Sequence, residues 1–188
     1  MPDDIKSISS YEQDFSAWSL AQAEALRAAR DVILSAGRRR ADLPSVLQRL
    51  DWDNLAEEIE GLAKKDRREI SSRITTIIEH LAKLEFSSAA PPRADWINTV
   101  QREREEVEDI LRDSPSLRRE AESAVARRAS AAISRACRAI SRQGEVEGRI
   151  AGRLSCKYTV EQVLGDWLPE TPPTPAHRGN RRRRSGMS

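Results

Sequence analysis

The stretch from Asp51 to Phe86 constrains the fold of this chain more than any other. Its apolar residues recur at steps of three and four, at Ile70, Ile74, Ile77, Leu81 and Leu84. This spacing is typical of one face of an α-helix. At 1.5 Å per residue the helix would be roughly 50 Å long. Because so long a one-sided helix is stable in water only when its apolar face is covered, we predict an all-α helical bundle built around one long central helix.

Two residues interrupt the pattern of this helix. Gly61 costs about 1 kcal/mol relative to alanine in a helix interior, so it is a weak point at which the helix can bend or break. Asp66 falls within the apolar stripe, and we expect it either near the edge of the bundle or paired with Arg67 or Arg73.

Two helices are predicted before the central one. The first begins near Tyr11 or Asp14 and ends at Gly37, since glycine commonly follows the last helical residue. Its apolar side is predicted from spacing to hold Phe15, Trp18, Gln22, Ala25, Leu26, Ala29, Val32 and Ile33. A short second helix starts near Pro44 and ends near Leu50, before Asp51 and Asp53 cap the central helix.

Three helices are predicted after the central one. Prolines in the loop 87–93 end it, and Asp95 is expected to cap the next helix. Ser114 is then expected to cap a further helix that runs to about Arg142. The inner face of that helix is small, with Ala121, Ala124, Val125, Ala129, Ala132, Ala136 and Ile140. A last short helix opens with Thr159 and Gln162, which have the spacing of a capping box.

The chain divides by composition into three parts: a flexible N-terminus at 1–10, a helical bundle domain at 11–169 and a disordered basic tail at 170–188. Charged residues make up 33% of the chain, which fits a bundle of narrow-striped helices. The net charge of +2 comes from five tail arginines, because the remaining 27 basic residues are outnumbered by 30 acidic ones. The body therefore lacks the basic bias of a nucleic-acid-binding domain.

The cysteines and the apolar runs suggest a location. Cys137 and Cys156 do not make a disulfide framework, and no secretory signal is visible, so a reducing cytoplasm is expected. We expect a buried thiol at Cys137. No apolar run reaches the roughly 20 residues of a membrane span, and we therefore expect no membrane contact.

Glu58 and His80 are the weak candidates for catalysis, in a metal-assisted or acid/base enzyme. Neither belongs to a known metal-binding or nucleotide-binding spacing, and no cofactor or metal is expected. His80 is alternatively a hydrogen-bonded interhelical histidine, and Glu58 part of a salt-bridged helix edge.

Arginines offer a second weak signal, for contact with nucleic acid. They gather on the predicted fifth helix, at Arg118, Arg119, Arg127, Arg128, Arg135 and Arg138, and in the tail, at Arg181, Arg182, Arg183 and Arg184. Such clusters contact phosphate groups without sequence preference, although a solvated surface is the alternative interpretation.

Motifs spread over the whole folded part carry a family resemblance. They are Tyr11, Asp14, Phe15, Trp18, Leu26-Arg27, Asn54-Leu55, Glu57 to Glu60, His80-Leu81, Lys83, Trp96, Arg102, Arg104, Ser114 to Leu117, Cys156 to Thr159 and Leu168-Pro169. In their order and spacing the chain resembles the bacterial family called domain of unknown function 29. It departs from that pattern in a longer stretch of 23 residues between Arg27 and Asp51, and in Leu84, where the family tends to have tryptophan. The resemblance implies an all-helical domain and no established activity.

The leading functional hypothesis is a non-enzymatic interaction or regulatory module that acts through a protein partner or self-association. It rests on mixed-charge helical faces and the small-residue helix after Ser114. The alternatives are a nucleic-acid-binding accessory protein that uses the arginines, and an enzyme that uses Glu58 and His80.

Overall fold

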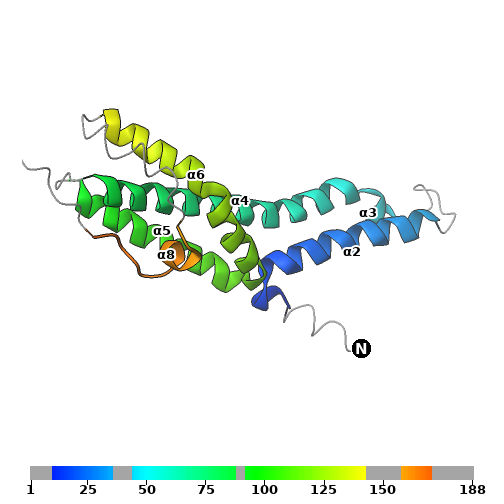
Figure 1. The fold of residues 1–188 in the computed structure, drawn as a ribbon. Helices are drawn as coiled ribbons and strands as arrows, with labels where there is room; N and C mark the ends of the chain where they lie inside the picture. Colours follow the sequence, from blue (N-terminus) through cyan, green and yellow to red (C-terminus); the bar gives the residue numbers. More distant parts are fainter. Residues whose placement is uncertain (1–9, 36–43, 88–91, 143–157, 171–188) are drawn as a thin grey trace, which may run out of the picture.

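The computed structural model describes residues 10–35, 44–87, 92–142 and 158–170, and every regular element in these ranges is helical (Figure 1). The elements are α2 (Phe15–Ser35), α3 (Ser45–Gln48), α4 (Trp52–Phe86), α5 (Arg93–Asp113), the 3-10 helix η2 (Pro115–Leu117), α6 (Arg118–Arg142) and α8 (Val160–Leu164). The predicted all-α fold with one long central helix is confirmed.

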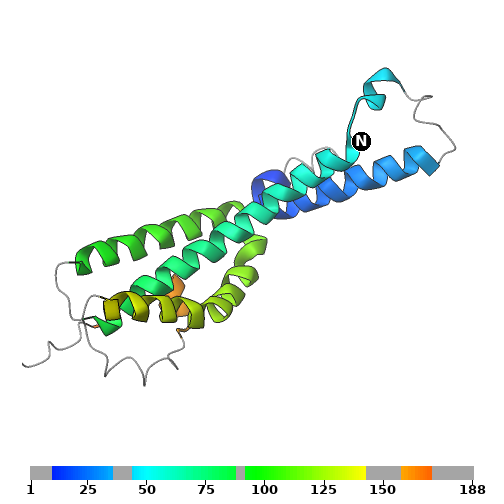
Figure 2. The ribbon, with the colours of Figure 1, turned by 90° about the horizontal axis from the view of Figure 1, so that it is seen from above.

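Helix α4 is the axis of the molecule. Asp51 caps it, accepting a hydrogen bond from the amide of Asn54, and the helix continues through Gly61 without a break. It packs against α2, α5, α6 and α8 (Figure 2). The partners divide its length between them: α2 lies along the N-terminal half, and α5 and α6 flank the C-terminal half.

The C-terminal half of α4 forms a three-helix body with α5 and α6, and α8 packs onto it. Its core is made of large aliphatic side chains from α4, including Ile74, Ile77 and Leu81, against Val100 and Ile133. Leu84, at the family's tryptophan position, is fully buried in this core. The small inner face predicted for α6 is likewise buried.

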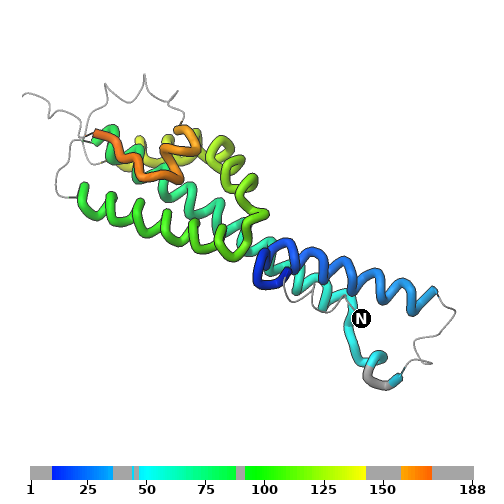
Figure 3. The backbone as a smooth tube through the Cα atoms, turned by 90° about the horizontal axis from the view of Figure 1, so that it is seen from below, coloured from blue at the N-terminus to red at the C-terminus, as the bar shows by residue number. Residues whose placement is uncertain are grey.

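The N-terminal half of α4 forms a two-helix arm with α2, which extends away from the body (Figure 3). The buried residues of this contact are small: Ser16, Ser19 and Ala23 on α2, and Ala56 and Ala63 on α4. Arg27 and Glu60 form an ion pair at 2.5 Å, and Arg30 pairs with Asp53. Small side chains let the two helices approach closely but bury little apolar area.

The residues predicted to form the apolar side of the first helix do not form a buried face. The side chains of Ala25, Ala29 and Val32 are exposed, and Val32 retains 68% of its accessible surface. Phe15, Trp18 and Leu26 are only partly buried. Helix α2 instead turns its small serine and alanine face toward α4. On the other side, Tyr11 packs against Phe15 and Trp18 near the start of the helix.

One predicted cap is wrong, and another has the predicted position without the expected hydrogen bond. Helix α5 begins at Arg93, so Asp95 lies in its first turn and interacts with the helix dipole instead of capping it. Ser114 occupies the N-cap position of η2 with Pro115 in its first turn, as predicted, but its side chain does not cap the helix. Its hydroxyl instead accepts a hydrogen bond from the amide of Ser16 on α2.

Other local predictions are confirmed. Thr159 and Gln162 form the capping box of α8, and Cys137 is a buried free thiol. No helix in the described ranges is both long enough and apolar enough to cross a bilayer. The predictions for 1–9, Gly37, Cys156 and the tail after Glu170 lie outside the described residues.

Candidate functional site

Glu58 and His80, the two candidate catalytic residues, lie far apart on one helix. Both belong to α4, and at 1.5 Å per residue their Cα atoms are about 33 Å apart. Glu58 is exposed, whereas His80 is partly buried and its Nδ1 lies 2.9 Å from the carbonyl oxygen of Thr76. The histidine contact is thus within α4, not between helices. Burial lowers the pKa of His80, although the contact with Thr76 opposes this shift.

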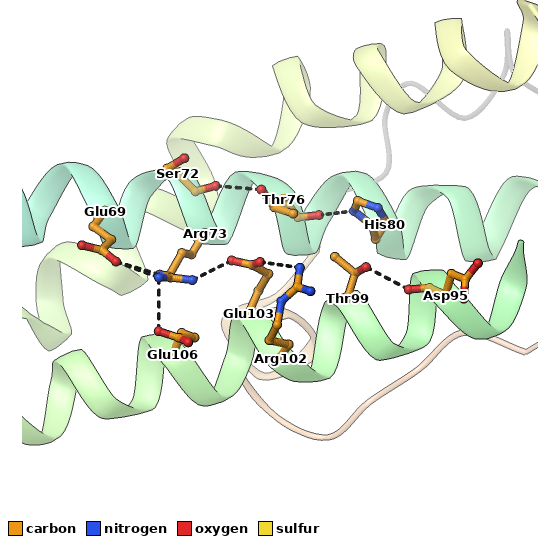
Figure 4. Close-up of polar contacts among 10 residues, drawn as sticks. All are labelled: Glu69, Ser72, Arg73, Thr76, His80, Asp95, Thr99, Arg102, Glu103 and Glu106. Atoms are coloured by element: carbon orange, nitrogen blue, oxygen red, sulfur yellow. Dashed lines mark hydrogen bonds and ion pairs between the residues drawn. The ribbon is translucent and has the colours of Figure 1, made fainter.

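Arg73 joins α4 to α5 through a polar seam near His80 (Figure 4). Its guanidinium pairs with Glu69 on α4, and with Glu103 and Glu106 on α5, at 2.7 to 3.2 Å. Burial disfavours the charged form of Arg73, but the hydrogen bonds to the glutamates outweigh it and raise its pKa. The seam therefore fixes α5 against α4. No group of three or more potential metal ligands occurs among the described residues.

Three arginines of α6 are occupied by contacts within the chain. Arg128 donates to the hydroxyl of Ser71 on α4 at 2.8 Å, and Arg135 pairs with Glu79. Arg127 pairs with Glu120 on its own helix. The tail arginines Arg181 to Arg184 lie outside the described residues.

Asp14 has a role that the sequence alone did not reveal. Its carboxylate accepts hydrogen bonds from the amide of Ala17 at 2.7 Å and from the amide and hydroxyl of Ser116 at 2.5 and 2.9 Å. It thereby caps α2 and fastens that helix to the turn between α5 and α6. The signal available in the sequence was the pair of motifs at Asp14 and Ser114 to Ser116, but spacing alone does not show that they meet.

Arg104 holds the C-terminal segment against α5. Its guanidinium donates to the carbonyl oxygens of Gln162, Val163 and Trp167 at 2.8 to 2.9 Å. Burial lowers the pKa of this arginine. Arg93 adds a hydrogen bond to the carbonyl of Pro169 at 3.1 Å. These contacts account structurally for part of the motif set that carries the family resemblance.

A cleft of about 390 Å³ marks the point where the body ends and the arm begins. Its lining consists of Tyr11, Glu12 and Phe15 from the N-terminal region, Asp66 from α4, and Ile110 and Asp113 from the end of α5. Burial raises the pKa of Asp66, and the carboxylates of Glu69 and Asp113 add to the effect. Asp66 thus lies at the edge of the bundle, and it has no arginine partner among the described residues.

The stripe of α4 that faces α5 is polar at Arg73 in the body and becomes apolar beyond this cleft, in the arm. Arg73 lies on the stripe that faces α5, as its pairing with Glu103 shows. Five turns earlier the same stripe carries Leu55, followed by Ile59 and Leu62. Leu55 and Leu62 retain 40% and 43% of their surface. The stripe that α5 covers in the body therefore continues along the arm, where no described helix covers Leu55 and Leu62.

Helix α2 contributes to the same side of the arm. Phe15 shares the cleft with Asp66, and Leu26 and Ile33 follow Phe15 after three turns and then two more. The partly buried side chains of α2 and the stripe of α4 therefore border one surface. We call it the arm face, and it comprises Leu26, Ile33, Leu55, Ile59 and Leu62. The ion pairs of Glu60 with Arg27 and Lys64 lie on the opposite side.

These features define an all-α protein in which a two-helix arm extends from a three-helix body along one shared helix. The chain belongs to the family described as domain of unknown function DUF29, whose pattern matches residues 10–168. A crystal structure of an α-helical protein of unknown function from Rhodospirillum rubrum ATCC 11170 is similar to it, with 26% sequence identity and a TM-score of 0.62. The similarity covers 83% of this chain and 89% of that one. No curated protein matches the sequence.

Proposed function

We propose that this protein is a non-enzymatic interaction module that binds another protein chain through the arm face. The carrying observation is the stripe of α4, which α5 covers in the body and which lies open at Leu55 and Leu62 in the arm. Contiguous exposed apolar side chains on a folded domain are typical of protein-binding surfaces. The amphipathic pattern of α2, which predicts burial of a face that the chain leaves open, supports the same proposal.

The two alternative functions have less support from the described residues. A nucleic-acid surface on α6 would draw on six arginines, yet Arg127, Arg128 and Arg135 are held by partners within the chain. That leaves Arg118, Arg119 and Arg138, which are exposed and form no ion pair with any described residue. Glu58 and His80 are about 33 Å apart along α4, at about 1.5 Å per residue. An enzyme that used them would therefore need separate partner residues around each one. Protein binding through the arm face depends neither on free arginines nor on a cluster of catalytic residues.

A photo-crosslinking amino acid in place of Leu62 tests the proposal in the cells that make the protein. We expect illumination to attach a second polypeptide to this variant, and Leu55→Asp in the same chain to abolish the adduct. Leu34 supplies the control position, because it is exposed at 50% but lies outside the arm face. Equal adducts from both positions, or none from Leu62 in a folded variant, would contradict the proposal.

A further inference from the structure

We infer that the occupant of the arm face is a second copy of this chain, bound so that the two α4 helices run antiparallel. This inference rests on the proposed function and names its partner. The shape of the molecule carries the first step. Helix α5 lies on the same side of α4 as the arm face, and it ends at the cleft formed with Asp66 and Phe15. A partner that covers the arm face must therefore lie beyond the C-terminal end of α5.

The position of α5 allows only one direction for a second copy. If the two α4 helices ran parallel, the bodies would lie side by side, and the α5 helix of each would occupy the space needed by the α4 helix of the other. If they run antiparallel, each body lies beyond the tip of the partner's arm. The α4 helix of the copy then continues the line of α5 over the arm face.

The apolar residues fit this direction. Leu55 and Leu62 are placed symmetrically about the pair Glu58 and Ile59, so an antiparallel copy centred there brings each Leu55 against the copied Leu62. The same register places the start of the copied α4, at Trp52, opposite Lys65, next to the cleft where α5 ends. Two arms of two helices each would then form a four-helix bundle, the common way in which helical pairs bury such stripes.

The charges at the ends of the stripe also fit. Lys65 is exposed and forms no ion pair with any described residue. In this register it lies opposite the copied Trp52 and next to the copied Asp51, which is likewise exposed, at both ends of the symmetric contact. Both Glu58 side chains lie near the axis on the exposed flank, where water screens their repulsion.

Sedimentation of the purified chain tests the copy as partner. We expect a concentration-dependent dimer whose dissociation constant rises by about tenfold or more in Leu62→Asp. Leu34→Asp is the matched control, and we expect a change of less than about twofold because Leu34 lies outside the arm face. Circular dichroism confirms that both variants remain helical. A chain that stays monomeric at high concentration, or two variants that behave alike, overturns the inference.

Cross-linking tests the direction and the register. Chains with one accessible cysteine are made with Leu55→Cys or Leu62→Cys in a background carrying Cys156→Ser, in which the only other cysteine, Cys137, stays buried. We expect a short bis-maleimide to join the mixture of the two chains several-fold more than either chain alone, since Leu55 faces the copied Leu62. Equal linkage in all three samples overturns the antiparallel register.

The outcomes separate this inference from the proposed function. If the purified chain is monomeric but the photo-crosslinker at Leu62 attaches a different polypeptide, the inference fails and the proposed function stands. If the adduct has the mass of the chain alone, with an internal link, a segment of the same chain covers the arm face and both fail.

Discussion

At the scale of single residues, Asp14 joins two parts of the chain that are distant in sequence. Replacing it by alanine removes the acceptor for Ala17 and for both donors of Ser116. We expect Asp14→Ala to lower the free energy of unfolding by about 2 kcal/mol, because a helix cap and a turn contact are lost together. Urea unfolding measures this, with Glu24→Ala on the exposed side of α2 as control. Equal stability of the two variants would contradict the assigned role.

His80 gives a prediction about pH. Its pKa in the folded protein lies below the ordinary value of 6.5, so the unfolded chain binds more protons as the pH falls past that value. Stability is thus complete above about pH 6.5 and declines below it. We expect the free energy of unfolding to fall between about pH 7.5 and pH 5.5 in the wild type, and to fall less in His80→Gln. Parallel pH profiles for the two proteins would show that His80 does not titrate as described.

At the scale of elements, Arg104 decides whether the segment 158–170 stays docked. We expect Arg104→Ala to speed amide exchange in this segment by on the order of tenfold or more, because three backbone carbonyls lose their donor. The rest of the body should exchange as before. Arg102→Ala is the control, since the Arg102 side chain is 65% exposed and pairs with Glu103, its neighbour on the same helix. Similar exchange in both variants would refute the prediction.

Sequence and structure agree best on elements whose signals are local. The start of α4 at Asp51 and the capping box of α8 depend on neighbouring residues, and both were predicted from spacing. The start of α5 was misplaced, because Asp95 is as favourable in a first turn as at a cap. The hydrogen-bond partner of the Ser114 side chain was missed, because Ser16 comes from a helix distant in sequence.

At the scale of the whole molecule, the arm and the body differ in what they bury. The arm buries alanine and serine, whereas the body buries isoleucine and leucine. We therefore expect arm amides in monomeric Leu62→Asp to open at a lower free energy than amides near Ile77 and Leu81. Hydrogen exchange measures this, and in the wild type the protection of the arm should rise with protein concentration. Uniform protection in the variant would contradict it.

By itself the sequence determined the helices, their approximate limits, the central place of α4 and the family, because these depend on periodicity and on local capping chemistry. It did not determine which face of α2 is buried, nor that Glu58 and His80 share one helix without meeting. Only the tertiary structure decided these points. Helix α5 ends near Asp66, so it does not cover the stripe of α4 in the arm. Where one helix ends beside another in space depends on contacts between residues that are distant in sequence, and the sequence pattern alone does not show these contacts.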